Sequence, residues 1–439
     1  MTLRLTILGT GYLGATTAAC LAEMGFEVLG MDVDKAKVEA LTEGRLPFYE
    51  PGLPGLLRKH VDGGRLRFTT SYAEAAEFGD VHFLCVGTPQ REGEHAADLS
   101  YVNSVVDGLA PHLRRPTLVV GKSTVPVGTA ARLEQRLHDL APVGDGVELA
   151  WNPEFLREGF AVEDTLRPDR IVVGLPATST TGEALLREVF AQPIAGGTPF
   201  LVTDYATAEL VKGSANAFLA TKISFINAMA ELCEATGADV TVLADALGHD
   251  ARIGRRFLNA GIGFGGGCLP KDIRAFSARA GELGIDLTLL REVDAINLRR
   301  RAHVVDLARE LVGGSLRDAR VGVLGAAFKP DSDDVRDSPA LAVAGQLQLQ
   351  GAVVTVYDPQ AIENARNVFP TLGYADSALA ACQAADLVVH VTEWAEFREL
   401  EPAALGDVVS ERRVLDARNV LDPARWRAAG WTYRALGRP

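Results

Sequence analysis

Short β-rich segments alternate with helical patterns at both ends of this chain of 439 residues. Near the amino terminus, the segments that predict strands are Leu3–Leu8, Glu27–Met31, Val81–Val86, Thr117–Lys122, Glu148–Trp151 and Arg170–Gly174. The alternation resumes after two glycines at 313 and 314, with predicted strands at Arg320–Leu324, Ala352–Tyr357, Asp386–Val391 and Arg412–Asp416. Strands separated by helices form βαβ units on parallel sheets. We therefore expect an α/β protein with two Rossmann-like domains.

The middle of the chain has a different pattern. Between Thr203 and Gly248, apolar residues recur at helical spacing, at Ala208, Val211, Ala215, Leu219, Ile223 and Ile226. Residues 249–272 are glycine-rich and irregular, and a second helical stretch runs from Ile273 to Leu311. These patterns predict an α/β domain over 1–202, a central helical segment over 203–312, and a second α/β domain over 313–439.

The charge balance limits the partners of the chain. There are 57 acidic and 44 basic residues, for a formal net charge of −13, which works against binding to nucleic acid or to an anionic membrane. No run of 18 apolar residues occurs, and Met1–Gly9 lacks the apolar core of a signal peptide. We therefore expect a soluble, cytoplasmic protein that holds any anionic ligand through local groups.

The cysteines are few, and their positions are scattered: Cys20, Cys85, Cys233, Cys268 and Cys382. Their odd number argues against a disulfide framework, and the absence of a CxxC pair argues against a zinc site, so no metal is expected. Four of them lie in apolar or helical surroundings and are expected to be buried and inert. Cys268 lies in a different setting.

A glycine motif opens the first α/β domain. Gly9, Gly11 and Gly14 form a GxGxxG sequence directly after a predicted strand and at the start of a predicted helix. Such a turn lets the backbone approach a pyrophosphate, and the amides at the helix N-terminus face its charge. Asp32 ends the second strand, where its carboxylate can bind a ribose diol and would repel a 2′-phosphate. The pattern predicts an NAD site, whose cleft Thr88 and Thr124 would join from later strand ends.

The sharpest local signal surrounds Cys268. Five glycines occur within Gly261–Gly267, directly before the cysteine, and Pro270 suits the first turn of a helix. Cys268 is therefore expected at or just before a helix N-terminus, where the free amides stabilise a thiolate. Asp272 would lie about one turn further on, near the thiol. The alternative reading, a small buried hydrophobic residue, is the usual one for a single cysteine.

Two further pairs of polar residues are candidates for the functional site. Lys212 and Asn216 are four residues apart in a predicted helix and share a face, where they could stabilise an oxyanion beside a thiolate. Glu154 and Glu158 follow a predicted strand and are also four apart. Taken alone, each pair is more typical of a solvated surface.

Four segments together carry a resemblance to a known family. They are Trp151–Gly159 (WNPEFLREG), Ala208–Asn227, Gly263–Asp272 (GFGGGCLPKD) and Phe328–Pro339. The chain resembles the nucleotide-sugar 6-dehydrogenases over essentially its whole length, from Gly9 to Arg418. One departure is Gly267, which stands where the family usually has Ser before the cysteine.

The resemblance implies a double oxidation of the C6 hydroxyl of UDP-glucose to UDP-glucuronate, with NAD and no metal. Cys268 would form a thiohemiacetal and then a thioester, which water hydrolyses. Lys212 and Asn216 would stabilise the oxyanion, and Asp272 would position or activate water. Glu154 and Thr124 resemble residues near the catalytic water and the proton transfers.

The resemblance also assigns binding residues. For NAD these are Gly9, Gly11, Tyr12, Leu13, Gly14, Asp32, Lys37, Thr88, Thr124, Glu158, Lys271 and Arg336. For the UDP-sugar they are Glu154, Phe155, Leu156, Arg157, Lys212, Asn216, Arg252, Phe257, Leu258, Asn259, Gly261, Gly265, Lys329 and Arg418. Arg252 resembles an arginine that crosses a dimer interface, so a homodimer built on the central helical segment is implied.

Three other functions stay open at this point. The same chemistry could act on GDP-mannose or on a UDP-N-acetylhexosamine. A two-electron β-hydroxyacid dehydrogenase shares a helix with a Lys-x-x-x-Asn sequence, although the Cys268 loop argues against it. A catalytically silent sensor of NAD(H) or of a nucleotide sugar would tolerate loss of the nucleophile, whereas here every reacting group is present.

Overall fold

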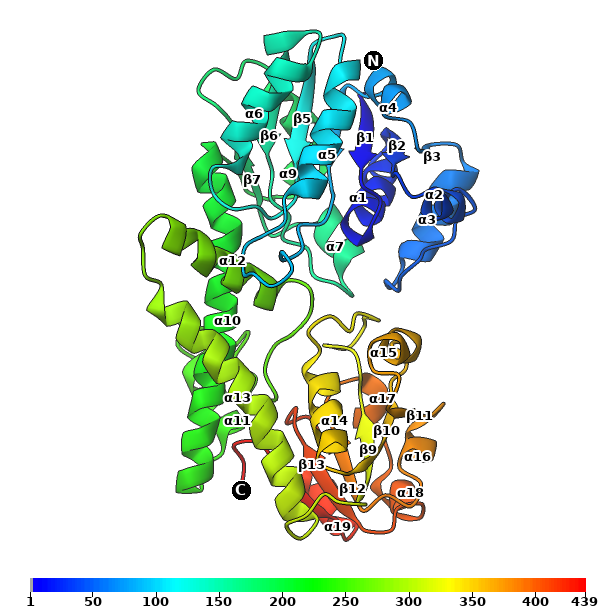
Figure 1. The fold of residues 1–439 in the computed structure, drawn as a ribbon, viewed down its shortest axis with the longest axis vertical. Coiled ribbons are helices and arrows are strands. Elements are labelled where there is room, and N and C mark those ends of the chain that lie inside the picture. Colours follow the sequence, from blue (N-terminus) through cyan, green and yellow to red (C-terminus); the bar gives the residue numbers. More distant parts are fainter. Residues whose placement is uncertain (1–2) are drawn as a thin grey trace. The chain divides into compact units, whose positions relative to one another are not determined.

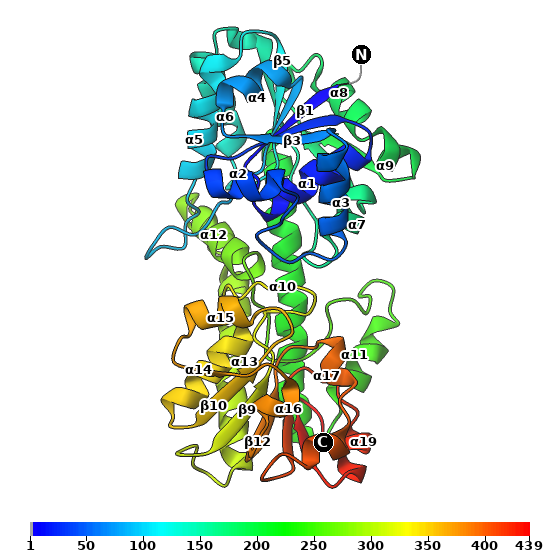
Figure 2. The same ribbon diagram turned by 90° about the vertical axis from the view of Figure 1, so that its right-hand side faces the viewer.

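The computed structural model describes residues 3–439, which form two compact units (Figures 1 and 2). The first unit extends to Ala215 and includes Ala278–Gly284, and the second comprises Asn216–Ser277 and Ile285–Pro439. Each unit contains one sheet, which confirms the expected α/β class with two Rossmann-like folds. The division into three segments with the expected boundaries stays a prediction.

The sheet of the first unit has the strand order β3-β2-β1-β4-β5-β6-β7-β8. Its first six positions follow the dinucleotide-binding order, with β1 at the centre beside β4. All neighbours are parallel except β6 and β7, which pair antiparallel through Trp151 and Gly174. The strands are β1 (Arg4–Leu8), β2 (Glu27–Met31), β3 (Leu66–Thr69), β4 (Val81–Leu84), β5 (Thr117–Gly121), β6 (Val147–Trp151), β7 (Ile171–Gly174) and β8 (Phe200–Thr203).

Helices follow the strands of this sheet, and two apolar clusters form the core of the unit. The helices are α1 (Tyr12–Glu23), α2 (Lys35–Thr42), α3 (Leu53–Asp62), α4 (Tyr72–Phe78), α5 (Ser100–Leu109), α6 (Thr129–Leu140), α7 (Ala161–Leu166), α8 (Gly182–Val189) and α9 (Ala191–Ala195). Short 3₁₀ turns lie at Ala110–His112 and Gly144–Gly146.

The sheet of the second unit is parallel and has the order β11-β10-β9-β12-β13-β14, and Figure 2 shows β10, β9 and β12 side by side. Its strands are β9 (Arg320–Leu324), β10 (Val353–Tyr357), β11 (Gly373–Tyr374), β12 (Leu387–His390), β13 (Arg413–Asp416) and β14 (Thr432–Ala435). Its later helices are α14 (Pro339–Leu349), α15 (Ile362–Val368), α16 (Ala378–Ala381), α17 (Ala395–Arg398), α18 (Pro402–Gly406) and α19 (Pro423–Ala428). One large apolar cluster packs around this sheet, and two smaller clusters lie among the central helices of the same unit.

The central helices are α10 (Tyr205–Thr236), α11 (Val240–Gly248), α12 (Leu269–Glu282) and α13 (Thr288–Leu311). The expected single helical stretch from Ile273 to Leu311 is wrong, because two helices occupy it. Gly284, with φ +76°, adopts the left-handed conformation that ends a helix, so α12 stops before α13 begins. Among residues 3–439, no helix combines the length and apolar composition that a bilayer crossing requires.

Candidate active site

The glycine motif forms a tight turn between β1 and α1. Gly9, with φ +91°, donates its N–H to Met31 O (2.8 Å), and α1 begins at Tyr12, directly after Gly11. Gly14 has no room for a side chain, because a Cβ there would overlap the carbonyl oxygen of Gly9. The backbone can therefore approach a ligand phosphate at the start of α1, so the turn fits the pyrophosphate of NAD.

Asp32 lies at the end of β2, where the sequence places a ribose-binding carboxylate. Its Oδ2 accepts hydrogen bonds from Thr10 N (2.8 Å) and Lys37 Nζ (2.9 Å). Burial raises the pKa of Asp32, but the hydrogen bonds from Lys37, Thr10 and Asp34 outweigh it and the net pKa is lowered. An ionised carboxylate that accepts hydrogen bonds suits a ribose diol.

Glu50 joins two segments that were expected to bind the cofactor. This buried carboxylate accepts a hydrogen bond from the Tyr12 hydroxyl on α1, and others from Gly159 N (2.7 Å) and Ala161 N (2.8 Å). Gly159 directly follows Glu158, and Ala161 begins α7. Burial and Glu50 raise the pKa of Tyr12, so its hydroxyl stays protonated and donates. No sequence motif indicates this role of Glu50.

Hydroxyl side chains connect the ends of β4 and β5. Thr88 Oγ1 donates to Thr124 O (2.7 Å), and Ser123 Oγ donates to Val86 O (2.7 Å). The structure thus brings Thr88 and Thr124 together, as the sequence predicts. Their contact with the cofactor stays a prediction.

Glu154 is held by a lysine that the sequence analysis missed. Lys122 Nζ, at the end of β5, lies 2.9 Å from Glu154 Oε2 and 2.9 Å from Asn152 Oδ1. Glu154 Oε1 accepts from the N–H groups of Phe155 (2.8 Å) and Leu156 (3.0 Å). Burial raises the pKa of Glu154, but Lys122 and these N–H groups outweigh it, so the pKa is lowered and the group is ionised at neutral pH.

Two cations lie near the ring of Phe155. The Arg170 guanidinium lies 3.9 Å from the centroid of its ring, and Lys212 Nζ lies 5.5 Å from that centroid. Arg157 is instead engaged by Asp164 on α7, at 2.6 Å between Nη2 and Oδ1. The structure therefore brings Phe155 and Lys212 together within the first unit.

The start of α10, which carries Lys212, is fixed by Glu209. This buried carboxylate accepts from Gly128 N (2.7 Å) and Ala130 N (2.7 Å) and so caps α6. Burial raises the pKa of Glu209. A rigid attachment of α10 to the loop after β5 follows from this cap.

Cys268 is the last residue before α12, as the sequence predicts. Its carbonyl oxygen accepts from Asp272 N (2.9 Å), and its side chain is exposed, whereas those of Cys20, Cys85, Cys233 and Cys382 are buried. Burial raises the pKa of Cys20, Cys85 and Cys382 to about 12. These three thiols therefore stay protonated, and Cys268 is in the setting that favours a reactive thiolate.

Asp272 joins α10 to α12. Its Oδ2 accepts from Asn216 Nδ2 (2.6 Å), and its Oδ1 lies 2.6 Å from Lys271 Nζ. Both Asn216 and Asp272 are buried. The structure thus brings together Asn216, Lys271 and Asp272, one helical turn after Cys268, while the expected contact of Lys271 with NAD stays a prediction.

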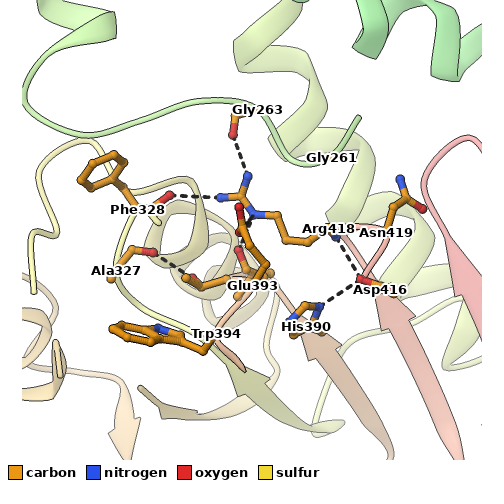
Figure 3. A network of polar contacts seen from close by, with 12 residues as sticks. Gly261, Gly263, Ala327, Phe328, His390, Glu393, Trp394, Asp416, Arg418 and Asn419 are labelled. Carbon is orange, nitrogen blue, oxygen red and sulfur yellow. Dashed lines mark hydrogen bonds and ion pairs between the residues drawn. The ribbon is translucent and has the colours of Figure 1, made fainter. Parts of the chain in front are cut away.

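Arg418 follows β13 and binds three carbonyl oxygens (Figure 3). Its Nη1 donates to Gly263 O (3.1 Å), and its Nη2 donates to Phe328 O (3.2 Å). Its Nε donates to Val391 O (2.8 Å) and lies 3.2 Å from Glu393 Oε2. Arg418 therefore connects the glycine loop before Cys268 to the ends of β9 and β12.

Asp358 ends β10 of the second unit, the position that corresponds to Asp32 in the first. Its Oδ2 accepts from Ala326 N (2.8 Å), Ala327 N (3.0 Å) and Trp394 Nε1 (3.0 Å), and its Oδ1 accepts from two more N–H groups. Both carboxylate oxygens of Asp358 therefore accept hydrogen bonds from the protein itself. Asp358 thus fixes the turn after β9 and the loop after β12.

The other residues expected to bind the sugar nucleotide lie in the second unit. Phe257 has a left-handed backbone (φ +66°), Leu258 is buried, and Asn259 Oδ1 accepts from Arg255 Nη1 (2.8 Å). Arg252 pairs with Asp250 at 2.6 Å, and its side chain is 89% exposed. Their contacts with the substrate stay predictions.

The remaining residues expected to bind a ligand are Lys329, Arg336 and Gly265, and Gly267 lies directly before Cys268. Lys329 Nζ lies 5.5 Å from the centroid of the adjacent Phe328 ring, and Arg336 pairs with Asp334 at 2.6 Å. A Cβ at Gly265 would lie against the carbonyl oxygen of Asp337, and one at Gly267 would overlap the Arg336 guanidinium. The guanidinium thus occupies the space that a serine at position 267 would need.

Three domains of one family match the chain. The NAD-binding domain of the UDP-glucose/GDP-mannose dehydrogenase family matches residues 3–194, its central domain matches 206–299, and its UDP-binding domain matches 322–423.

Curated relatives and a solved structure agree with this match. UDP-glucose 6-dehydrogenase from Rhizobium meliloti is 41% identical over 437 residues, which cover 100% of both chains. UDP-glucose 6-dehydrogenase from Pseudomonas aeruginosa is 41% identical and covers 100% of this chain and 98% of its own. The structure of a UDP-glucose dehydrogenase from Pyrobaculum islandicum superposes with a TM-score of 0.92 at 37% identity, over 100% of this chain and 98% of that one. The chain belongs to the UDP-glucose/GDP-mannose dehydrogenase family.

Proposed function

We propose that this protein oxidises the C6 hydroxyl of UDP-glucose twice, with NAD⁺, to give UDP-glucuronate. The observation that carries the proposal is the position of Cys268, an exposed thiol directly before α12 and one turn before the buried Asp272–Asn216 pair. A thiolate at a helix N-terminus is an activated nucleophile, and an adjacent amide can stabilise an oxyanion. The relatives named above favour UDP-glucose as the substrate.

When bound, NAD⁺ supplies the hydride acceptor for each of the two oxidations. In the first oxidation, the C6 hydroxyl loses its proton and one C6 hydrogen leaves as hydride, which gives the aldehyde. The thiolate of Cys268 then attacks the aldehyde carbon, and a C–S bond forms to give a thiohemiacetal whose oxyanion Asn216 and Lys212 stabilise. Loss of the C6 hydrogen as hydride from this oxyanion gives the thioester. Asp272 positions the water that attacks the thioester, the C–S bond breaks, and the carboxylate leaves with Cys268 as a thiol.

Glu154 and Thr124 serve the proton transfers in this proposal. The ionised Glu154 carboxylate, held by Lys122 at 2.9 Å, can accept a proton through water, and Thr124 can relay one through its hydroxyl. The Gly9–Gly14 turn and Asp32 would hold the pyrophosphate and ribose of the cofactor, and Arg418, Lys329 and the Phe257–Gly261 loop would hold the nucleotide sugar.

The experiment that tests the proposal counts NADH released per UDP-glucose. Two NADH per sugar are expected for the wild-type enzyme, and Cys268→Ser should abolish the second oxidation. Cys233→Ala, which alters a buried cysteine of α10, is the matched control and should keep the stoichiometry. One NADH per sugar, or full activity of Cys268→Ser, contradicts the thioester route. Turnover of GDP-mannose or a UDP-N-acetylhexosamine in place of UDP-glucose contradicts the substrate assignment.

The functional protein is a homodimer in the same proposal. Phe218, Phe225 and Leu232 lie at seven-residue intervals along α10, with 66%, 47% and 57% of their surfaces exposed. An apolar stripe with this spacing is typical of a helix that packs against another helix. We infer that α10 of a second copy covers the stripe.

A further inference from the structure

The loop Gly261–Gly267 is buried up to Gly266 although it contains neither helix nor strand. Residues 261–266 are all buried, and Gly263 and Gly266 have φ of +95° and +84°. Buried backbone outside regular structure must find hydrogen-bond partners elsewhere. In this loop, the partners come from α10, from α13 and from the loop after β13.

Asn297 on α13 makes a pair of hydrogen bonds to the backbone of one loop residue, Phe264. Its Oδ1 accepts from Phe264 N (2.8 Å), and its Nδ2 donates to Phe264 O (2.9 Å), so one amide satisfies both polar groups of that residue. Asn297 is completely buried. A Cβ at Gly263 would overlap the Asn297 amide, so only glycine lets the backbone approach it this closely.

Other contacts fix the loop on both sides of Phe264. Asn227 on α10 accepts from Gly261 N (2.8 Å), and Arg418 donates to Gly263 O (3.1 Å; Figure 3). Gly266 N donates to Arg336 O (2.9 Å). Asn297 and Arg301 on α13 both contact Phe264, and Asn297 makes the shorter hydrogen bonds: Arg301 Nη2 lies 3.4 Å from Phe264 O. Three glycines separate Phe264 from Cys268.

We propose that Asn297 is a positioning residue for Cys268: its paired hydrogen bonds to Phe264 set where the glycine loop enters α12 and hence where the thiol lies. This inference rests on the proposed function of Cys268 as the nucleophile. Glycines have wide conformational freedom, so a Gly-Gly-Gly segment transmits a fixed position only if its preceding residue is held. A nucleophile displaced by about 1 Å can lose about 100-fold in rate, whereas substrate binding depends on other contacts.

Two variants of Asn297 test the inference. Asn297→Ala removes both hydrogen bonds. Asn297→Asp keeps the volume of the side chain and the acceptor for Phe264 N, but places a carboxylate oxygen against Phe264 O. This variant provides the test if Asn297→Ala does not fold. The matched control is Ser224→Ala, which removes another buried hydrogen bond between α10 and α13, from Ser224 Oγ to Val293 O (2.7 Å), one turn before Asn297.

The measurements are kcat and KM for UDP-glucose, the melting temperature, and the rate of Cys268 alkylation by iodoacetamide between pH 6 and 9, followed by mass spectrometry. We expect both Asn297 variants to lower kcat about 10- to 100-fold with KM changed less than about threefold, and to shift the pH profile of alkylation. Ser224→Ala should lose comparable thermal stability with kcat and the alkylation profile unchanged.

Asn297 variants that match Ser224→Ala in kcat and in alkylation overturn the inference. Alkylation does not require turnover, so it separates this inference from the proposed function. If wild-type enzyme does not oxidise UDP-glucose but Asn297→Ala still shifts the alkylation profile, the proposed function fails and the positioning of Cys268 by Asn297 stands.

Discussion

Asn216 Nδ2 lies 2.6 Å from Asp272 Oδ2, and this buried hydrogen bond joins α10 to α12. The two residues are 56 positions apart in the sequence, and each was expected in the catalytic group on separate grounds. Lys271 Nζ holds the other oxygen of the carboxylate at 2.6 Å. Asp272 is thus fixed in orientation, and its charge is available one helical turn after Cys268.

Asp272→Asn removes this charge while keeping the shape of the side chain. We expect kcat to fall about 100-fold, because a neutral amide cannot activate water for thioester hydrolysis, whereas the first hydride transfer does not need it. Rapid-quench analysis should show a covalent adduct on Cys268. Asp286→Asn, which removes an exposed carboxylate paired with Arg291, is the control and should keep wild-type kcat. Equal kcat values for the two variants would exclude a role of Asp272 in catalysis.

Gly14→Ala should weaken cofactor binding. A methyl group at this position would overlap Gly9 O and lie 3.3 Å from Cys85 Cβ, so the turn between β1 and α1 must open. We expect the Kd for NAD⁺ to rise at least about tenfold in calorimetry, a loss of about 1.4 kcal/mol or more. Gly55→Ala on α3, where a Cβ would meet no atom within 4 Å, is the control and should leave the Kd unchanged. Wild-type affinity in Gly14→Ala would mean that the turn does not hold NAD⁺.

The central strands were predictable because each is a continuous apolar run. The expected and observed bounds are identical for Glu27–Met31 and Arg320–Leu324. The edge strands β3 (Leu66–Thr69), β8 (Phe200–Thr203), β11 and β14 were not predicted. These strands are short, and several of their residues face solvent, so no apolar run marks them.

Local signals also placed Cys268 at a helix start, because the glycine run, the cysteine and Pro270 lie within one short segment. Glu50, Lys122 and Asn297 left no such signal. Glu50 and Gly159 are separated by 109 residues, and Asn297 and Phe264 by 33. A buried polar residue that acts through distant partners becomes visible only when the fold brings those partners to it. For Lys122, its position as the last residue of a predicted strand was the available clue.

The apolar stripe on α10 makes the dimer testable. The double substitution Phe218→Glu and Phe225→Glu places charges where we infer that a second copy packs, and burial of unpaired charge is costly. Sedimentation velocity should then show monomers in place of the wild-type dimer. Leu349→Glu on α14, at a residue that is 80% exposed, is the control and should stay dimeric. A dimer that survives the double substitution would place the interface on another surface.

Lys122→Met should change the sign of the contribution that ionised Glu154 makes to the free energy of unfolding. In the wild-type protein the pKa of Glu154 is lowered, so its contribution is complete above 4.5, its ordinary value, and is lost as pH falls through the folded pKa. Without Lys122, burial dominates and raises the folded pKa above 4.5. The variant then loses stability as pH rises from 4.5 through the raised folded pKa of Glu154. At neutral pH the loss is about 3 kcal/mol, because the buried carboxylate has lost its charged partner.

Urea unfolding at pH 4 to 8 measures this difference between Lys122→Met and wild type. Lys59→Met provides the control, because Lys59 pairs with Glu23 at 2.7 Å with 60% of its side chain exposed, and such pairs contribute at most about 1 kcal/mol. The gap between Lys122→Met and wild type should widen from pH 4 to 8, while the gap for Lys59→Met stays small. A constant gap for Lys122→Met across this range would show that Lys122 does not control the ionisation of Glu154. The same substitution should also raise the pKa of the acidic limb of kcat, since Glu154 would then bind its proton to higher pH.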